Sequence, residues 1–139
     1  ILAAEHRVQM VRLAIAGVLA MRPRVLVLDE PTAMLDPVGR EEVMRTVEEL
    51  NRSEGLTVIH ITHSMEEAAR ARRVMALASC TFAYDGQSKD FFSRSDMVRK
   101  LHLEMPSLAR LAELLRTKNI DIPTGTYTVE AMARCLIPS

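Results

Sequence analysis

The sequence has no tryptophan, and its two tyrosines and three phenylalanines all lie beyond residue 81. The first 81 residues therefore offer no aromatic ring on which a base or a sugar could stack. An excess charge of one sign is also lacking, because 18 lysines and arginines balance 18 aspartates and glutamates. Proteins that bind nucleic acids normally carry a basic excess, so the composition argues against that class.

Long apolar runs and cysteines are scarce as well. No apolar run reaches the roughly 18 residues of a membrane span, and Arg7 and Arg12 interrupt any signal-peptide core. Cys80 and Cys135 are too few and too far apart for a disulfide framework or a zinc site, which favours reduced thiols in a cytosolic protein. The 139 residues suffice for one modest domain. Because they begin with Ile1, we expect a fragment or a processed product.

The first part of the chain shows the spacing of helices and buried strands. Apolar residues recur every three or four positions over 7–21, which predicts a helix that Pro23 ends. Residues 25–28 are all apolar, as in a strand buried on both faces of a parallel sheet. Residues 57–62 are rich in β-branched side chains and predict a second strand.

Capping residues mark two further helices. Asp36 followed by Pro37 is typical of a helix start, and Gly55 of its end. The spacing from Ser64 to Glu67 matches a capping box. Strand, helix, strand and helix in this order predict an α/β fold with a parallel sheet.

The second part of the chain is mostly helical in pattern. Residues 73–86 predict a hairpin, and helices follow from about residue 88. Pro106 or Ser107 opens one of these helices, and Thr128 is the expected cap of the last. We therefore expect one α/β unit followed by a helical tail.

Polar residues follow both predicted strands of the sheet. Asp29 and Glu30 follow the first strand, and His63 follows the second. In an open parallel sheet, ligands bind beyond the carboxyl ends of the strands. One carboxylate there can hold Mg²⁺ and the next can orient or deprotonate an attacking water, while the histidine can donate to a terminal phosphate. Taken alone, the two carboxylates would favour a solvated turn after the strand.

The combined motifs resemble those of the ATP-binding cassette (ABC) ATPases. VLVLDEP at 25–31 is similar to their Walker B segment, TAMLDP at 32–37 to the D-loop, and ITH at 61–63 to the H-loop. The resemblance is strongest to the ATPase subunits of energy-coupling factor (ECF) transporters, where MEEA at 65–68 and IDIP at 120–123 also have counterparts. It implies a partial P-loop NTPase fold with flanking helices, a small hairpin and a helical C-terminal tail.

This resemblance implies a role for several residues. Asp29 is the expected Mg²⁺-linked carboxylate, Glu30 the residue that polarises the lytic water, and His63 the switch histidine. Asp36 is the expected D-loop aspartate, which communicates across an ATPase dimer, although a helix cap would explain it equally well. His60 and His102 receive no role.

Two features depart from the family pattern. No Gly-rich phosphate loop of the Walker A type occurs in the sequence, so ATP and Mg²⁺ would need one from another segment or chain. The signature Leu-Ser-Gly-Gly-Gln aligns without gaps with 5–9. Its first four residues are replaced by Glu5, His6, Arg7 and Val8, and Gln9 is retained as a cofactor contact. Side chains at Arg7 and Val8 stand where phosphate needs bare backbone, so this segment is not expected to bind ATP.

The implied function is that of the C-terminal half of an ECF-type ABC ATPase, which couples ATP hydrolysis to uptake of a vitamin or metal ion and is inactive in isolation. Residues 1–87 would be the half-domain and 88–139 the tail. Expected partners are a second ATPase subunit, a transmembrane coupling subunit and a substrate-binding membrane subunit, but no nucleic acid. The expected place is the cytoplasmic side of the membrane.

Two alternatives remain open from the residues. One is a non-catalytic, truncated or degenerate ABC interaction module, which the missing phosphate loop favours. The other is a DNA-repair type of ABC ATPase head. The neutral net charge and the lack of a long heptad segment argue against it.

Overall fold

The computed structural model describes residues 2–123, 125–127 and 129–137. The chain divides into two compact units, Ile1–His63 and Ser64–Ser139. Within the described residues, no helix is both long and apolar enough to cross a membrane.

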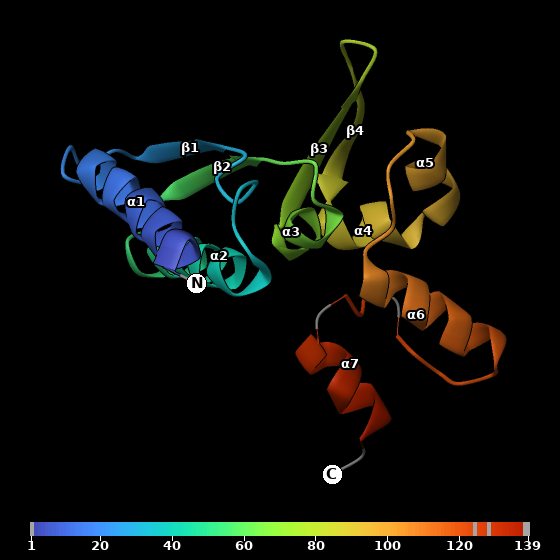
Figure 1. The fold of residues 1–139 in the computed structure, drawn as a ribbon. Coiled ribbons are helices and arrows are strands. Elements are labelled where there is room, and N and C mark those ends of the chain that lie inside the picture. Colours follow the sequence, from blue (N-terminus) through green and yellow to red (C-terminus); the bar gives the residue numbers. More distant parts are fainter. Residues whose placement is uncertain (1, 124, 128, 138–139) are drawn as a thin grey trace. The chain divides into compact units, whose positions relative to one another are not determined.

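The first unit is a two-stranded parallel sheet with two helices (Figure 1). Its elements, in chain order, are α1 (Leu2–Leu19), β1 (Val25–Asp29), α2 (Pro37–Ser53) and β2 (Thr57–Ile61). The register runs from Val25 opposite Thr57 to Asp29 opposite Ile61. The parallel pairing predicted from the strand–helix–strand order is confirmed.

The ends of α2 follow from its sequence. Asp36 is the N-cap, and its Oδ1 accepts the backbone N–H of Gly39 at 3.0 Å. Pro37 occupies the first turn, and Gly55 just past the end has φ +63°, a conformation that glycine adopts without strain. Helix α1 begins at Leu2, five residues before the predicted start.

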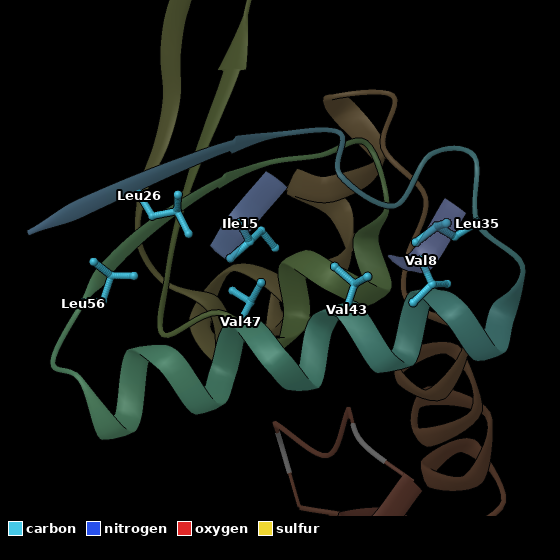
Figure 2. Packing of buried hydrophobic residues seen from close by; sticks show 7 residues of the cluster. All are labelled: Val8, Ile15, Leu26, Leu35, Val43, Val47 and Leu56. Atoms are coloured by element: carbon cyan, nitrogen blue, oxygen red, sulfur yellow. The ribbon is translucent and has the colours of Figure 1, made fainter. Parts of the chain in front are cut away.

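The core of the first unit lies between the helices and one face of the sheet (Figure 2). Val43 and Val47 on α2 point toward the sheet, where they meet Leu26 of β1 and Ile15 of α1. Val18, one of the apolar residues whose spacing predicts the helix over 7–21, is 37% exposed. At roughly 100° per residue, it lies about 80° around α1 from the buried Val8.

The second unit consists of a hairpin and five helices among the described residues. These are, in chain order, α3 (Met65–Arg70), β3 (Arg73–Ala78), β4 (Thr81–Gln87), α4 (Ser88–Ser93), α5 (Ser95–Lys100), α6 (Ser107–Thr117) and α7 (Val129–Leu136). The predicted hairpin is confirmed as an antiparallel pair. Positive φ angles at Ser79 and Cys80 form its tight turn, as type I′ turns require.

The predicted starts of two helices in this unit are confirmed. Ser64 caps α3, because its side chain accepts the N–H of Glu67, and α6 begins at Ser107 after Pro106. The predicted cap Thr128 lies outside the described residues.

Aromatic and apolar side chains form the core of the second unit. Phe91 and Phe92 of α4 are 1% and 2% exposed, and their ring centroids lie 5.0 Å apart. Tyr84 of β4 and Met65 of α3 pack against the same cluster. A smaller cluster joins α6 and α7 through buried side chains that include Ala112 and Met132.

Candidate functional site

Asp29 and Glu30 stand at the carboxyl end of β1. Asp29 is the last residue of the strand, pairs with Ile61 of β2 and is exposed. Glu30 extends the ladder by one bond, since its backbone N–H donates to the carbonyl oxygen of Ile61 at 2.9 Å. The two carboxylates therefore lie at the edge of the sheet where the sequence predicts a ligand site.

The side chain of Glu30 reaches across to His63, which follows β2. The backbone N–H of His63 donates to Oε1 of Glu30 at 3.0 Å, and Nδ1 of its ring lies 2.7 Å from the same oxygen. An ionised carboxylate only accepts, so in this contact Nδ1 carries the proton and donates. Nε2, the second ring nitrogen, is left for another partner.

The backbone at Glu30 is in the left-handed region, with φ +46°. A residue with a Cβ pays about 1–2 kcal/mol in this conformation. The other described non-glycine residues with positive φ follow helices or form the hairpin turn, whereas Glu30 follows a strand. The hydrogen bonds to Ile61 and His63 hold Glu30 in this conformation and direct its carboxylate toward His63.

The exposure of the pair suits contact with a ligand. The side chain of His63 is 81% exposed and that of Glu30 is 34% exposed. Both hydrogen bonds to the carboxylate of Glu30 use Oε1, so Oε2 can accept from a water. No cluster of three potential metal ligands occurs among the described residues. Mg²⁺ often takes only one or two protein carboxylates besides phosphate and water, so Asp29 fits that share.

Asp36 has a different role from Glu30 and His63, because it caps a helix. Its Oδ1 accepts the N–H of Gly39 in the first turn of α2, so the helix cap foreseen as an alternative is present. The cap alone accounts for an aspartate at this position. A contact across an ATPase dimer remains a prediction.

The segment aligned with the family signature lies inside a helix. Leu2–Leu19 is one continuous helix, so residues 5–8 present no helix N-terminus. Val8 is 5% exposed and belongs to the core, and Nη1 of Arg7 donates to the carbonyl oxygen of Met34 at 3.1 Å. Gln9 is exposed in the middle of α1. That the segment does not bind phosphate remains a prediction.

The direct contact between Glu30 and His63 was not predicted from the sequence. The sequence did carry a signal for it, since each residue follows one of two strands expected to be adjacent and parallel. The left-handed backbone of Glu30 had no such signal.

Comparison with known proteins identifies related sequences. The ECF transporter ATP-binding protein EcfA1 of Caldanaerobacter subterraneus is 48% identical over 121 residues, which cover 87% of this chain and 44% of that protein. EcfA1 of Clostridium perfringens is 43% identical over 125 residues, 90% of this chain and 44% of that protein. The chain thus spans less than half the length of these relatives. No protein-family model matches it.

Two solved structures share the fold over part of their length. CbiO1 of Clostridium perfringens, described as part of the ABC transporter complex CbiONQ, is 38% identical with a TM-score of 0.58 over 73% of this chain and 41% of that one. A dimeric ATP-binding cassette solved after hydrolysis with ADP and phosphate is 31% identical, with a TM-score of 0.53 over 58% of this chain and 35% of that one. Over most of its length the chain is therefore similar in sequence to the ATP-binding proteins of ECF transporters, and its fold is similar to part of two solved ABC ATPases.

Proposed function

We propose that this chain is part of an ABC ATPase in an ECF-type importer and supplies the residues that hydrolyse ATP. The importer would couple this hydrolysis to uptake of a vitamin or metal ion. The observation that carries the proposal is the contact of Glu30 with His63 beyond two parallel strands. It joins a carboxylate that can accept a proton to a histidine whose second nitrogen can reach a ligand.

In this proposal each residue of the site has a separate role in hydrolysis. Oε2 of Glu30 orients the attacking water and accepts its proton, while Oε1 stays bound to His63. His63 presents Nε2 toward the terminal phosphate. Asp29 holds Mg²⁺, which supplies charge neutralisation for the phosphate oxygens when bound. Asp36 contacts the second ATPase subunit.

The phosphates need a binding loop that the 139 residues do not contain. A Gly-rich loop with its lysine, on another segment or chain, would bind ATP and Mg²⁺ together with the residues above. The isolated chain is therefore expected to be inactive. Residues 1–87 would be part of the nucleotide-binding domain and 88–139 the helical tail.

Partners follow from the relatives' descriptions. One solved relative belongs to a transporter complex, and the other is dimeric. We accordingly expect a second ATPase subunit, a transmembrane coupling subunit and a substrate-binding membrane subunit, on the cytoplasmic side of the membrane. The relatives do not favour a stand-alone interaction module or a DNA-repair ATPase.

Complementation tests this function. The chain is mixed with, or fused to, an EcfA1 segment that carries the phosphate loop, and Mg²⁺-dependent release of phosphate from ATP is measured. Hydrolysis that is lost in Glu30→Gln supports the proposal. Hydrolysis that survives Glu30→Gln, or tight ATP binding by the isolated chain, contradicts it.

A further inference from the structure

The loop of residues 31–36 joins the end of the first strand to the cap of α2. Two backbone hydrogen bonds bridge it from within. The N–H of Ala33 donates to the carbonyl oxygen of Glu30 at 3.2 Å, and the N–H of Leu35 donates to that of Thr32 at 3.0 Å. A segment outside the helices and strands opens more easily than they do, so contacts from elsewhere in the unit matter for its conformation.

Arg7 of α1 makes one such contact with the loop. Its Nη1 donates to the carbonyl oxygen of Met34 at 3.1 Å, across 27 positions of the sequence. Met34 is 71% exposed, so burial of its side chain does not hold this part of the loop. The guanidinium of arginine keeps its charge at every physiological pH, and a charged donor strengthens a hydrogen bond. Arg7 therefore ties an exposed part of the loop to the helix.

Val8, the next residue of α1, makes a second contact. It is 5% exposed and lies in the same core cluster as Leu35 of the loop (Figure 2). It also comes close to the first turn of α2, because a Cβ built on Gly39 would lie only 2.5 Å from Cγ2 of Val8. Two adjacent side chains of α1 thus hold the loop, Arg7 through a backbone carbonyl and Val8 through the core. A glycine at either position could make neither contact.

The two ends of this loop carry residues of the candidate site. Glu30 precedes it, and the N–H of Ala33 binds the carbonyl oxygen of Glu30. Asp36 is its last residue and caps α2. The backbone of Glu30 has φ +46°, a conformation that persists only where the surrounding structure maintains it. The conformation of the loop therefore bears directly on how Glu30 is presented.

We infer that Arg7 is a positioning residue, which holds the loop of residues 31–36 against α1 and thereby helps to keep Glu30 oriented. All the residues concerned lie in the first compact unit. The effect on hydrolysis rests on the proposed function, whereas the contact with the loop does not.

Three variants of the chain test this role. Arg7→Ala removes the hydrogen bond to the loop, Arg7→Lys keeps a charged donor, and Arg12→Ala is the matched control, since it removes an ion pair of α1 with Glu42 on α2. In Arg7→Ala, hydrogen exchange at the amides of Ala33 and Leu35 should rise about fivefold, as for the loss of one hydrogen bond. Arg7→Lys should restore most of the protection. Arg12→Ala should leave the exchange of the loop unchanged.

Two outcomes of the exchange experiment would overturn the inference. One is equal exchange of the loop in Arg7→Ala and in the parent, which would mean that the hydrogen bond does not hold the loop. The other is an equal rise of exchange throughout α2, because Arg7 would then contribute to the stability of the whole unit and not to the loop.

Kinetics of the complemented enzyme supply the second measurement. Arg7→Ala should lower kcat roughly twofold to fivefold, the range of one hydrogen bond, with an unchanged KM for ATP, and Arg7→Lys should recover it. A raised KM with unchanged kcat would identify Arg7 as a nucleotide contact and overturn the inference. Unchanged kcat and KM beside faster loop exchange would also overturn it, because Arg7 would then be a structural contact only. Absence of hydrolysis in the parent would count against the proposed function, while the exchange measurements would still decide the contact with the loop.

Discussion

Oε1 of Glu30 receives two hydrogen bonds from one residue, the backbone N–H of His63 at 3.0 Å and its ring Nδ1 at 2.7 Å. A single oxygen therefore binds both the main chain and the side chain of the histidine. The arrangement fixes the orientation of the imidazole and leaves the second carboxylate oxygen for chemistry. The first two predictions below concern this pair.

Glu30→Gln should remove hydrolysis from the complemented enzyme while preserving ATP binding. The amide oxygen can still accept from His63, but the side chain can no longer take a proton from water. General-base groups contribute roughly 10²- to 10⁴-fold, and a loss in that range is expected in kcat. Phosphate release and nucleotide binding are measured on the same preparation. A loss of binding equal to the loss of rate would point to a folding defect instead.

His63→Ala should lower kcat and also free the side chain of Glu30, because the ring hydrogen bond at 2.7 Å disappears. The matched control is His102→Asn, since His102 is exposed and has φ +56°, a conformation that asparagine tolerates. The kcat of the control should equal that of the parent. Equal activity of His63→Ala and the parent would show that the histidine has no role in hydrolysis.

Asp36→Ala should destabilise the first unit by about 1 kcal/mol, the usual cost of an N-cap. Asp36→Asn keeps an acceptor for the N–H of Gly39 and should unfold close to the parent in thermal denaturation. The pair of variants separates the two roles of this aspartate. If Asp36→Asn is stable yet slows hydrolysis in the complemented dimer, the carboxylate also acts across the subunit boundary.

Asp85 should titrate below its ordinary value of 3.8, because the hydrogen bonds from Arg73 lower its pKa. Nε and Nη2 of Arg73 lie 2.6 and 2.7 Å from the two carboxylate oxygens. The pKa is lower in the folded state, so the stabilisation is complete above the unfolded value and is lost as pH falls through the folded value. An NMR titration from about pH 6 to about pH 2 measures it. The midpoint should move upward in Arg73→Gln, and an unmoved midpoint would refute the assignment.

The isolated chain should self-associate or be only marginally stable. Each strand of the β1–β2 sheet has one neighbour in the described structure, and unpaired strand edges invite further pairing. One sheet face also exposes apolar side chains, with Val27 at 57%, Ile59 at 49% and Ile61 at 50%. Sedimentation of the parent and of Ile59→Lys tests this. The variant should shift toward monomer, and a monomeric parent with a sharp, high-temperature unfolding transition would contradict the prediction.

The sequence predicted the elements well where local chemistry decides them. Asp36 with Pro37 fixes the start of α2, and Ser64 fixes the start of α3, since both caps act within one helical turn. The parallel pairing of β1 and β2 followed from the order of elements. Positions at the ends of strands could be foreseen for the same reason, which is why Glu30 and His63 were expected near one edge.

Contacts that depend on distant segments could not be predicted. The left-handed backbone of Glu30 is held by Ile61 and His63, which its own neighbours in sequence do not reveal. Glu66 resembles any exposed glutamate near a helix start, and its binding to Ser107 depends on packing across the second unit. The start of α1 was placed too late, because a hydrophobic stripe marks only the buried turns of a helix.

The parallel register of β1 and β2 has a kinetic consequence. Residues 25 and 57 can pair only after the intervening chain, with α2, has crossed over, so this ladder is a non-local contact formed at the cost of loop closure. Glu30 and His63 meet only when that crossover is complete. We therefore expect these two side chains to meet late in folding, so that their hydrogen bond reports when the first unit has assembled.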